Sequence, residues 1–296
     1  MAGVGVALGI KAAMEDHDID GKVILLGTPA EEGGAGKIHL LNSGAYDEMD
    51  VCLMSHPSVG PPKEAATSRS LAVQSVEVEF HGHTAHAGAQ PWEGQNALDA
   101  AVLTYNAVSV LRQQIKPDHR IHGIIEGKDW APNIIPDYAK MRWLVRAPNS
   151  AEVEILRDRL LNCIKAASMA TSCTVDTTQG LIMKDLRQND TLGQEFATAM
   201  EKYGYKTHVG PSVPISTAST DFGNITYALP SIHPRYGITQ VPGAGNHTAA
   251  FTKEAATQQA HHASLAIIKG LAMTGVRVLT DAQFFEKAKR EFESSV

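Results

Sequence analysis

The first seventy residues alternate between apolar runs and short helical segments. Residues 1–14 place apolar side chains at helical spacing and predict a helix. The run Lys22–Gly27 (KVILLG) is short and continuously apolar, which predicts a strand buried on both faces. A helix over about Lys37–Asn42, ended by Gly44, and a second strand over Val51–Ser55 would complete a β-α-β unit. The pattern therefore predicts a parallel sheet.

A different pattern begins at Leu71. The segment LAVQSVEVEF alternates apolar and polar residues in its second half, as a half-buried antiparallel strand does. The elements expected from there follow the order β-α-β-β-α-β, which predicts a ferredoxin-like domain. After the first strand they cover about 96–112 (helix), 120–125 and 138–146 (strands), 151–169 (helix) and 172–177 (strand).

The last third of the chain returns to the first pattern. We expect a helix near Leu192–Tyr203, a glycine-bearing loop around Asn246, and one long closing helix from about Lys253 to Thr274, ended by Gly275. The fold class is therefore α/β, with an α/β sheet domain formed by residues 1–70 and 185–296 and an inserted ferredoxin-like α+β domain over residues 71–184.

Charge and composition exclude several classes of function. Of the 296 residues, 26 are Lys or Arg and 32 are Asp or Glu, and the net charge of -6 argues against binding to nucleic acid or to an acidic membrane surface. Hydrophobic residues make up 43%, but no uninterrupted apolar run approaches the roughly 18 residues of a membrane span. The three cysteines form no C-x-x-C pair, which disfavours a disulfide framework and predicts a cytoplasmic protein.

The candidate chemistry lies at strand ends. Glu31 and Glu32 follow the first expected strand and His56 follows the second, so a parallel sheet would bring them to one edge. Adjacent carboxylates repel each other unless a cation or a shared proton relieves them. With His247, from the glycine-bearing loop, one Glu and two His would suit Zn²⁺ or Mn²⁺, and the other Glu could act as general base. A solvated acidic turn, a hydrogen-bonded core His56 and a surface His247 are the alternatives.

Two other kinds of site are disfavoured by the residues themselves. A phosphate-binding P-loop would need a glycine five residues before Gly36-Lys37 and Ser or Thr after it, but Glu31 and Ile38 occupy those positions. A serine nucleophile of the G-x-S-x-G type is absent, because Gly210-Pro211-Ser212-Val213-Pro214 breaks the pattern at its last position.

Several spaced motifs resemble the M20 family of metallopeptidases and amidohydrolases. They are TPAEEGG (28–34), MSHP (54–57), GHTAHA (82–87), NIIPD (133–137) and NHT (246–248). The resemblance implies a catalytic α/β domain with an inserted dimerisation or lid domain. It also implies a metal-dependent hydrolase of amide or peptide bonds in small substrates, dipeptides or N-acyl amino acids. The most similar subgroup resembles cytosolic dipeptidases that act on β-alanyl-lysine and related dipeptides.

The resemblance assigns roles to particular residues. Glu31 matches the general base of the family, and Glu32, His56 and His247 match ligands of a divalent metal, Zn or Mn, bound as one or two ions. His86 matches the histidine of the G-x-x-x-H segment, which in similar proteins reaches from the partner subunit to stabilise the tetrahedral intermediate. A homodimer formed through the inserted domain is thereby implied.

Three further residues follow from the same comparison. Asn133 and Arg146 match positions of the inserted domain that contact the substrate or its oxyanion. Asp221 matches a residue that supports the loop of the site without binding metal.

One motif of the family is missing. Its C-G-H-[DN] segment, which supplies early metal ligands, normally precedes the helix that begins here at Met1, and none of the three cysteines has neighbours that replace it. The sequence leaves two alternatives: a truncated gene model of an enzyme, or a short form with impaired catalysis that acts as a non-catalytic dimerising or binding partner.

Overall fold

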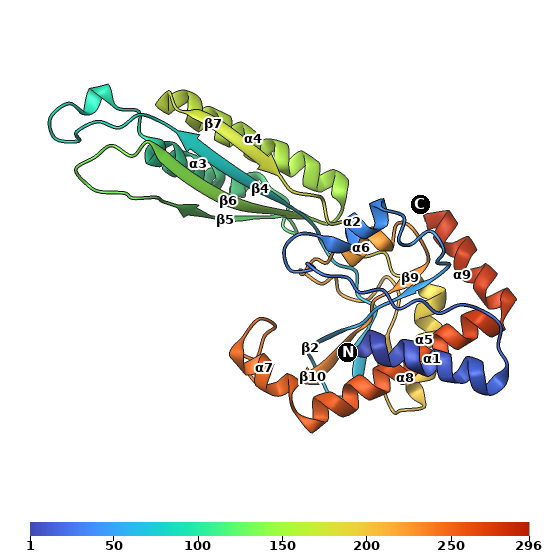
Figure 1. Cartoon of the computed structure of the whole chain (residues 1–296). Helices are drawn as coiled ribbons and strands as arrows, with labels where there is room; N and C mark the ends of the chain where they lie inside the picture. Colours follow the sequence, from blue (N-terminus) through green and yellow to red (C-terminus); the bar gives the residue numbers. More distant parts are fainter. Residues whose placement is uncertain (296) are drawn as a thin grey trace. The chain divides into compact units, whose positions relative to one another are not determined.

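The computed structural model describes residues 1–295, which form two compact units (Figure 1). The first unit comprises Met1–Ser70 and the chain from Leu186 onward, and the second comprises Leu71–Asp185. The helices of the first unit are α1 (Ala2–His17), α2 (Gly36–Asn42), α5 (Asp190–Glu201), α6 (Phe222–Ile225), α7 (Ala249–Ala255), α8 (Gln258–Thr280) and α9 (Ala282–Ser295). Its strands are β1 (Cys52–Leu53), β2 (His56–Val59), β3 (Glu64–Ala66), β8 (Lys206–His208), β9 (Ser231–Ile232) and β10 (Arg235–Thr239).

The sheet of the first unit is mixed. β1 pairs with β9 and β2 with β10, both in parallel, and backbone hydrogen bonds from Met54 and His56 continue the pairing across the gap between them. The four-stranded part has the order β2-β10-β3-β8, in which β3 pairs antiparallel with β10 and parallel with β8. Parallel pairing is therefore present, but it joins strands from the two parts of this unit and not the two strands expected at 22–27 and 51–55, and one pair of the sheet is antiparallel.

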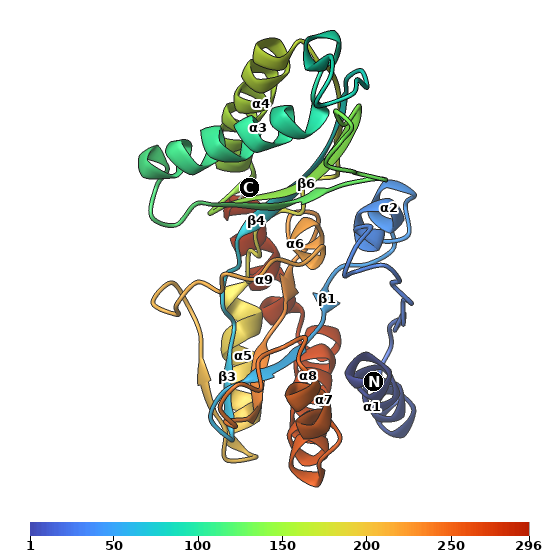
Figure 2. The same ribbon diagram turned by 90° about the vertical axis from the view of Figure 1, so that its left-hand side faces the viewer.

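The second unit has the β-α-β-β-α-β order that the sequence predicts. Its elements are β4 (Ala72–His81), α3 (Ala97–Leu111), β5 (Arg120–Glu126), β6 (Tyr138–Ala147), α4 (Ser150–Thr171) and β7 (Thr174–Gln179), with 3₁₀ turns at Pro91–Glu93 and Arg112–Gln114. The sheet is fully antiparallel with the order β5-β6-β4-β7, and β4 and β6 pair over their whole length. Figure 2 shows both helices on one face of this sheet.

Local sequence explains why the second unit was predictable. Alternate residues of β4, namely Val76, Val78 and Phe80, are fully buried against the helices, which is the period-two pattern of a sheet with one covered face. The side chain of Asn96 accepts hydrogen bonds from the first turn of α3, and that of Asn149 caps α4 in the same way. Both helices therefore begin where their capping residues place them.

The expected strand at Lys22–Gly27 is not formed. No strand of the described residues pairs with this segment, because β1 is hydrogen-bonded only to β9. Val23 packs against one hydrophobic core of the unit and Leu26 against another, whereas Ile24 and Leu25 are exposed. An apolar run gives a strand only where another strand satisfies its backbone groups, so the β-α-β prediction for this region is wrong.

The prediction of a single closing helix from about Lys253 to Thr274 is also wrong, because α7 and α8 are separate helices. The Thr257 side chain accepts a hydrogen bond from the backbone N–H of Ala260 and so begins α8 anew. Gly275 does not end α8 but lies inside it, where a Cβ atom would be 2.5 Å from Ile10 Cδ1 of α1. This glycine therefore permits close packing of α1 against α8.

By length and composition, α8 is the one helix of residues 1–295 that could cross a membrane, with a mean hydropathy of 1.4. Core helices of soluble proteins pass the same test. Ile267 and Leu271 of α8 are buried in the hydrophobic core that it shares with α1 and α5, and 33% of the apolar window is buried in this way.

We expect Gly275→Val to lower the free energy of unfolding by about 1–3 kcal/mol, because the added side chain overpacks the α1–α8 contact. Gly3→Val is the matched control, since the nearest atom to its Cβ is Leu25 Cδ1 at 3.8 Å, an ordinary contact distance. Urea unfolding followed by circular dichroism measures both. Equal effects of the two substitutions would contradict the close packing at Gly275.

Candidate active site

The loop that carries Glu31 and Glu32 is held tightly at its base. A Cβ atom at Gly36 would lie 1.9 Å from the carbonyl oxygen of Pro29, so only glycine permits this approach. Ala30 has a φ of 61°, a left-handed conformation that costs free energy in a residue other than glycine. The two carboxylates therefore follow a constrained turn, with Glu31 half-buried and Glu32 exposed.

The loop around His247 approaches the same carboxylates. His247 Nε2 lies 3.9 Å from Glu32 Oε2, and His247 itself has a φ of 68°. Both side chains are about three-quarters exposed, so water screens their attraction and the pair adds little stability. The proximity of an exposed imidazole to an exposed carboxylate thus fits ligand binding better than structural support.

The His56 ring is oriented by its own backbone. His56 Nδ1 lies 2.6 Å from the carbonyl oxygen of Pro57, so this nitrogen donates the hydrogen bond and Nε2 keeps a free lone pair. The side-chain amide of Asn246 donates to the same Pro57 oxygen at 3.3 Å. This bond joins the strand of His56 to the residue immediately before His247.

The donor set suits a borderline divalent metal in its chemistry. One carboxylate and two imidazoles are ligands that Zn²⁺ and Mn²⁺ accept, and the tautomer of His56 leaves a ligating nitrogen free. Within residues 1–295, however, no three His, Cys, Asp or Glu side chains lie close enough together to hold a metal ion. The structure pairs Glu32 with His247 and links His56 to their neighbourhood, but it does not bring the three together.

A buried ion pair lies at the start of α2, directly after the carboxylate loop. Lys37 Nζ donates to Asp221 Oδ1 at 2.7 Å, and the Lys37 backbone N–H donates to Asp221 Oδ2 at 2.9 Å. The two side chains are 3% and 0% exposed. The expected supporting role of Asp221 thus has a physical partner, Lys37, which the sequence analysis had not identified. The signal was a lysine at the start of a short helix that also carries Ile38, Leu40 and Leu41.

Two further buried groups, His233 and Cys52, lie near this ion pair. His233 packs against His56 and Phe222, and neither of its ring nitrogens has a hydrogen-bond partner. Burial, and after it the proximity of His56 and Lys37, lowers the pKa of His233 to about 3, so the ring is neutral. Burial also raises the pKa of Cys52 to about 12, which keeps this thiol protonated and unreactive.

His86, in the second unit, is held as a hydrogen-bond donor. Its Nδ1 accepts from the backbone N–H groups of Gly88 and Ala89 at 3.2 and 3.1 Å, so in the neutral ring the proton is on Nε2. The His86 side chain is exposed, which leaves this N–H available to another molecule.

Asn133 lies beside His86, but Arg146 does not. The backbone N–H of Ala87 donates to the carbonyl oxygen of Asn133 at 3.0 Å, which joins the two segments. Arg146 lies near the far end of β6, where its Nε donates to His122 Nε2 at 3.3 Å. At a rise of about 3.3 Å per residue, Arg146 is roughly 26 Å along the strand from Tyr138, where β6 begins.

Comparison with known proteins gives a consistent picture. Residues 72–171 match the family model of the peptidase dimerisation domain. The chain is 41% identical to a Xaa-Arg dipeptidase of Mus musculus, covering 98% of this chain and 67% of that protein. The human Xaa-Arg dipeptidase is 38% identical with the same coverage of each chain.

Solved structures share the fold. The aminobenzoyl-glutamate utilization protein of Klebsiella pneumoniae superposes with a TM-score of 0.72 at 16% identity, covering 93% of this chain and 67% of that one. A Bacillus subtilis protein described as a dinuclear metal-binding peptidase of the M20 family gives a TM-score of 0.67 at 17% identity, covering 93% and 70%.

We expect Lys37→Met to lower the free energy of unfolding by about 3–5 kcal/mol, because Asp221 is then a buried charge without a partner. Lys22→Met, which breaks the exposed pair with Glu48, is the control and should cost about 1 kcal/mol or less. The double variant Lys37→Met, Asp221→Leu should recover part of the loss. A loss for Lys37→Met no greater than that of the control, in urea unfolding, would contradict the structural role of the pair.

Proposed function

The chain belongs to the M20 family of metallopeptidases and amidohydrolases, and from this premise we propose that it hydrolyses the peptide bond of small dipeptides whose second residue is basic. The observation that carries the proposal is the approach of Glu32 and His247, from distant parts of the chain, with Glu31 next to Glu32 in the sequence. The names of the two mammalian relatives support arginine as one basic residue, and the resemblance to β-alanyl-lysine dipeptidases supports lysine as another.

Glu32, His56 and His247 are the ligands that we assign to the metal, Zn or Mn, as one or two ions; the assignment rests on their donor chemistry and requires the three side chains to come closer together than they do in the described geometry. When bound, the metal would polarise the scissile carbonyl. Glu31 forms no ion pair within the described residues, so its carboxylate is free to take the proton of the attacking water and to return it to the leaving amine. The constrained turn at Ala30 and Gly36 would fix the direction from which Glu31 acts.

The oxyanion that forms in this reaction needs a donor already in place. His86 Nε2–H is such a donor, because two backbone N–H groups hold the ring and set its tautomer. Asn133 would contact the same end of the substrate. Arg146 carries the positive charge that would bind a substrate carboxylate.

The separation of His86 and Arg146 supports a homodimer. The His86 segment joins the start of β6 and Arg146 lies near its end, so one small dipeptide could not contact both within one chain. Both can serve one substrate only if the second unit of a partner subunit supplies one of them, and we assign His86 to the partner. The three free cysteines fit a cytoplasmic location.

We expect the purified chain, supplied with Zn²⁺ or Mn²⁺, to hydrolyse alanyl-arginine and β-alanyl-lysine and to leave p-aminobenzoyl-glutamate intact. Glu31→Gln should lower kcat by about 10²–10⁴ while metal content and unfolding stay unchanged, because only the general base is lost. Glu15→Gln, an exposed change on α1, is the control.

Two results would overturn this part of the proposal. A Glu31→Gln variant with an ordinary rate would remove Glu31 from the reaction. A wild-type chain that takes up no metal and cleaves no dipeptide, yet forms dimers, would establish the alternative of a non-catalytic dimerising partner.

We expect two inactive variants to restore activity when mixed. His86→Ala should reduce kcat by about 10²–10³ without changing metal content. Mixed dimers of His86→Ala and Glu31→Gln contain one site with an intact Glu31 and an intact His86 from the other chain, so part of the activity should return. The measurement is the rate of alanyl-arginine hydrolysis after subunit exchange. No recovery despite demonstrated exchange would place His86 in the site of its own chain.

A further inference from the structure

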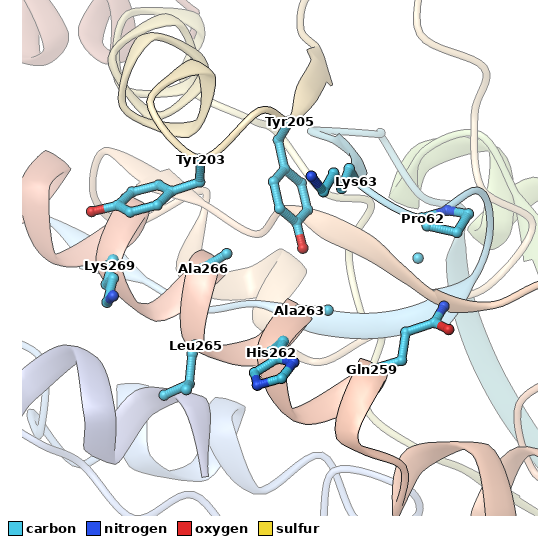
Figure 3. A pocket seen from close by; sticks show the side chains of 11 residues that line it. Pro62, Lys63, Tyr203, Tyr205, Gln259, His262, Ala263, Leu265, Ala266 and Lys269 are labelled. Carbon is cyan, nitrogen blue, oxygen red and sulfur yellow. The ribbon is translucent and has the colours of Figure 1, made fainter.

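A pocket of about 630 Å³ opens in the first unit between the turn before β3, the turn between α5 and β8, and α8 (Figure 3). Its volume lies within the range of small-molecule sites. None of the residues that line it belongs to the proposed hydrolytic site, so any ligand here would be additional to the dipeptide substrate.

Three basic side chains line the pocket without an acidic partner. They are Lys63, His262 and Lys269, and no Asp or Glu lies among the lining residues. None of the three forms an ion pair within residues 1–295. Lys269 instead lies over the ring of Tyr203, with its Nζ 5.5 Å from the ring centre. In a protein of net charge -6, this is a local concentration of positive charge.

The hydroxyl of a largely buried tyrosine is directed into the same space. Tyr205 is only 8% exposed, and its hydroxyl has no hydrogen-bond partner within the described chain. In Figure 3 its ring extends toward α8 with the hydroxyl foremost, and Lys63 lies beside it. Because the hydroxyl has no partner in the chain and is not itself sealed from solvent, it can donate to a ligand in the pocket. Burial raises the pKa of Tyr205, so the hydroxyl remains protonated and able to donate.

Apart from Gln259, the rest of the wall is mainly apolar. Pro62, Ala263 and Ala266 line the pocket, and Tyr203 and Tyr205 add aromatic rings. Small alanine side chains on α8 leave room for a flat group, and the rings favour one that can stack. The pocket thus combines an apolar wall with donors and cations but offers no carboxylate.

We propose that this pocket binds a small organic anion, with an apolar or aromatic body against the α8 alanines and tyrosine rings and an anionic head between Lys63, His262 and the Tyr205 hydroxyl. The head is a carboxylate or a phosphate, which share the acceptor oxygens that these groups require. The body distinguishes this ligand from inorganic anions, which would gain nothing from the apolar wall.

Isothermal titration of the full chain with benzoate, phenyl phosphate, benzamide and inorganic phosphate tests the proposal. We expect at least one of the first two to bind with one-to-one stoichiometry, and benzamide and inorganic phosphate to bind at least about tenfold more weakly. The tighter of benzoate and phenyl phosphate identifies the head. Lys63→Met should weaken its binding about tenfold, and Tyr205→Phe about fivefold.

Lys287→Met, an exposed lysine of α9, is the control for general loss of positive charge and should change nothing. Thermal unfolding verifies that each variant is folded, and a variant that is not folded is replaced by Lys269→Met. Binding of the anion that is unaffected by Lys63→Met and Tyr205→Phe would overturn the proposal. So would benzamide or inorganic phosphate binding as tightly as the organic anions.

Discussion

The contact between Lys37 and Asp221 is the constraint on which the carboxylate loop depends. Removing two charges from water is costly, and the cost is offset only when geometry and hydrogen bonding are good. Here Asp221 accepts from both the ammonium group and the backbone N–H of Lys37, so one carboxylate fixes the side chain and the start of α2 together. The turn with Glu31 and Glu32 is thereby tied, at its downstream end, to a segment distant in sequence.

The base and the tip of the Glu31–Glu32 loop differ in how firmly the structure holds them. At the base, a buried ion pair and the close approach of Gly36 to Pro29 leave little freedom. At the tip, Glu32 and His247 are exposed, and their attraction is weak because water screens it. A rigid base with an open tip would allow the side chains that we propose as metal ligands to adjust to an ion while the backbone that carries them stays in place.

Much of this arrangement was predictable where the information is local. Alternation along β4 and the capping residues Asn96 and Asn149 depend on neighbours in the sequence, so the second unit followed from its pattern. The structure of the run Lys22–Gly27 could not be predicted from its own pattern, because strand formation depends on a partner strand elsewhere in the chain. Lys37 was missed because a lysine is normally solvated, and only the tertiary fold shows that it meets Asp221. The approach of Glu32 to His247 does not come from the sheet-edge argument, because that argument joined Glu31 and Glu32 to His56 through a strand at Lys22–Gly27 that is not formed, and the described geometry does not form a three-ligand site.

The division of the chain into one continuous and one discontinuous unit has a consequence for its biosynthesis. All contacts within Leu71–Asp185 can form once that stretch has left the ribosome. The first unit must wait, because α1 packs on α8, which is translated after the whole of the second unit. During that interval the apolar face of α1 has no partner helix, and contacts of such large sequence separation form slowly. The nascent chain therefore passes through a stage in which one half is native and the other still exposes hydrophobic surface, the stage at which chaperones act.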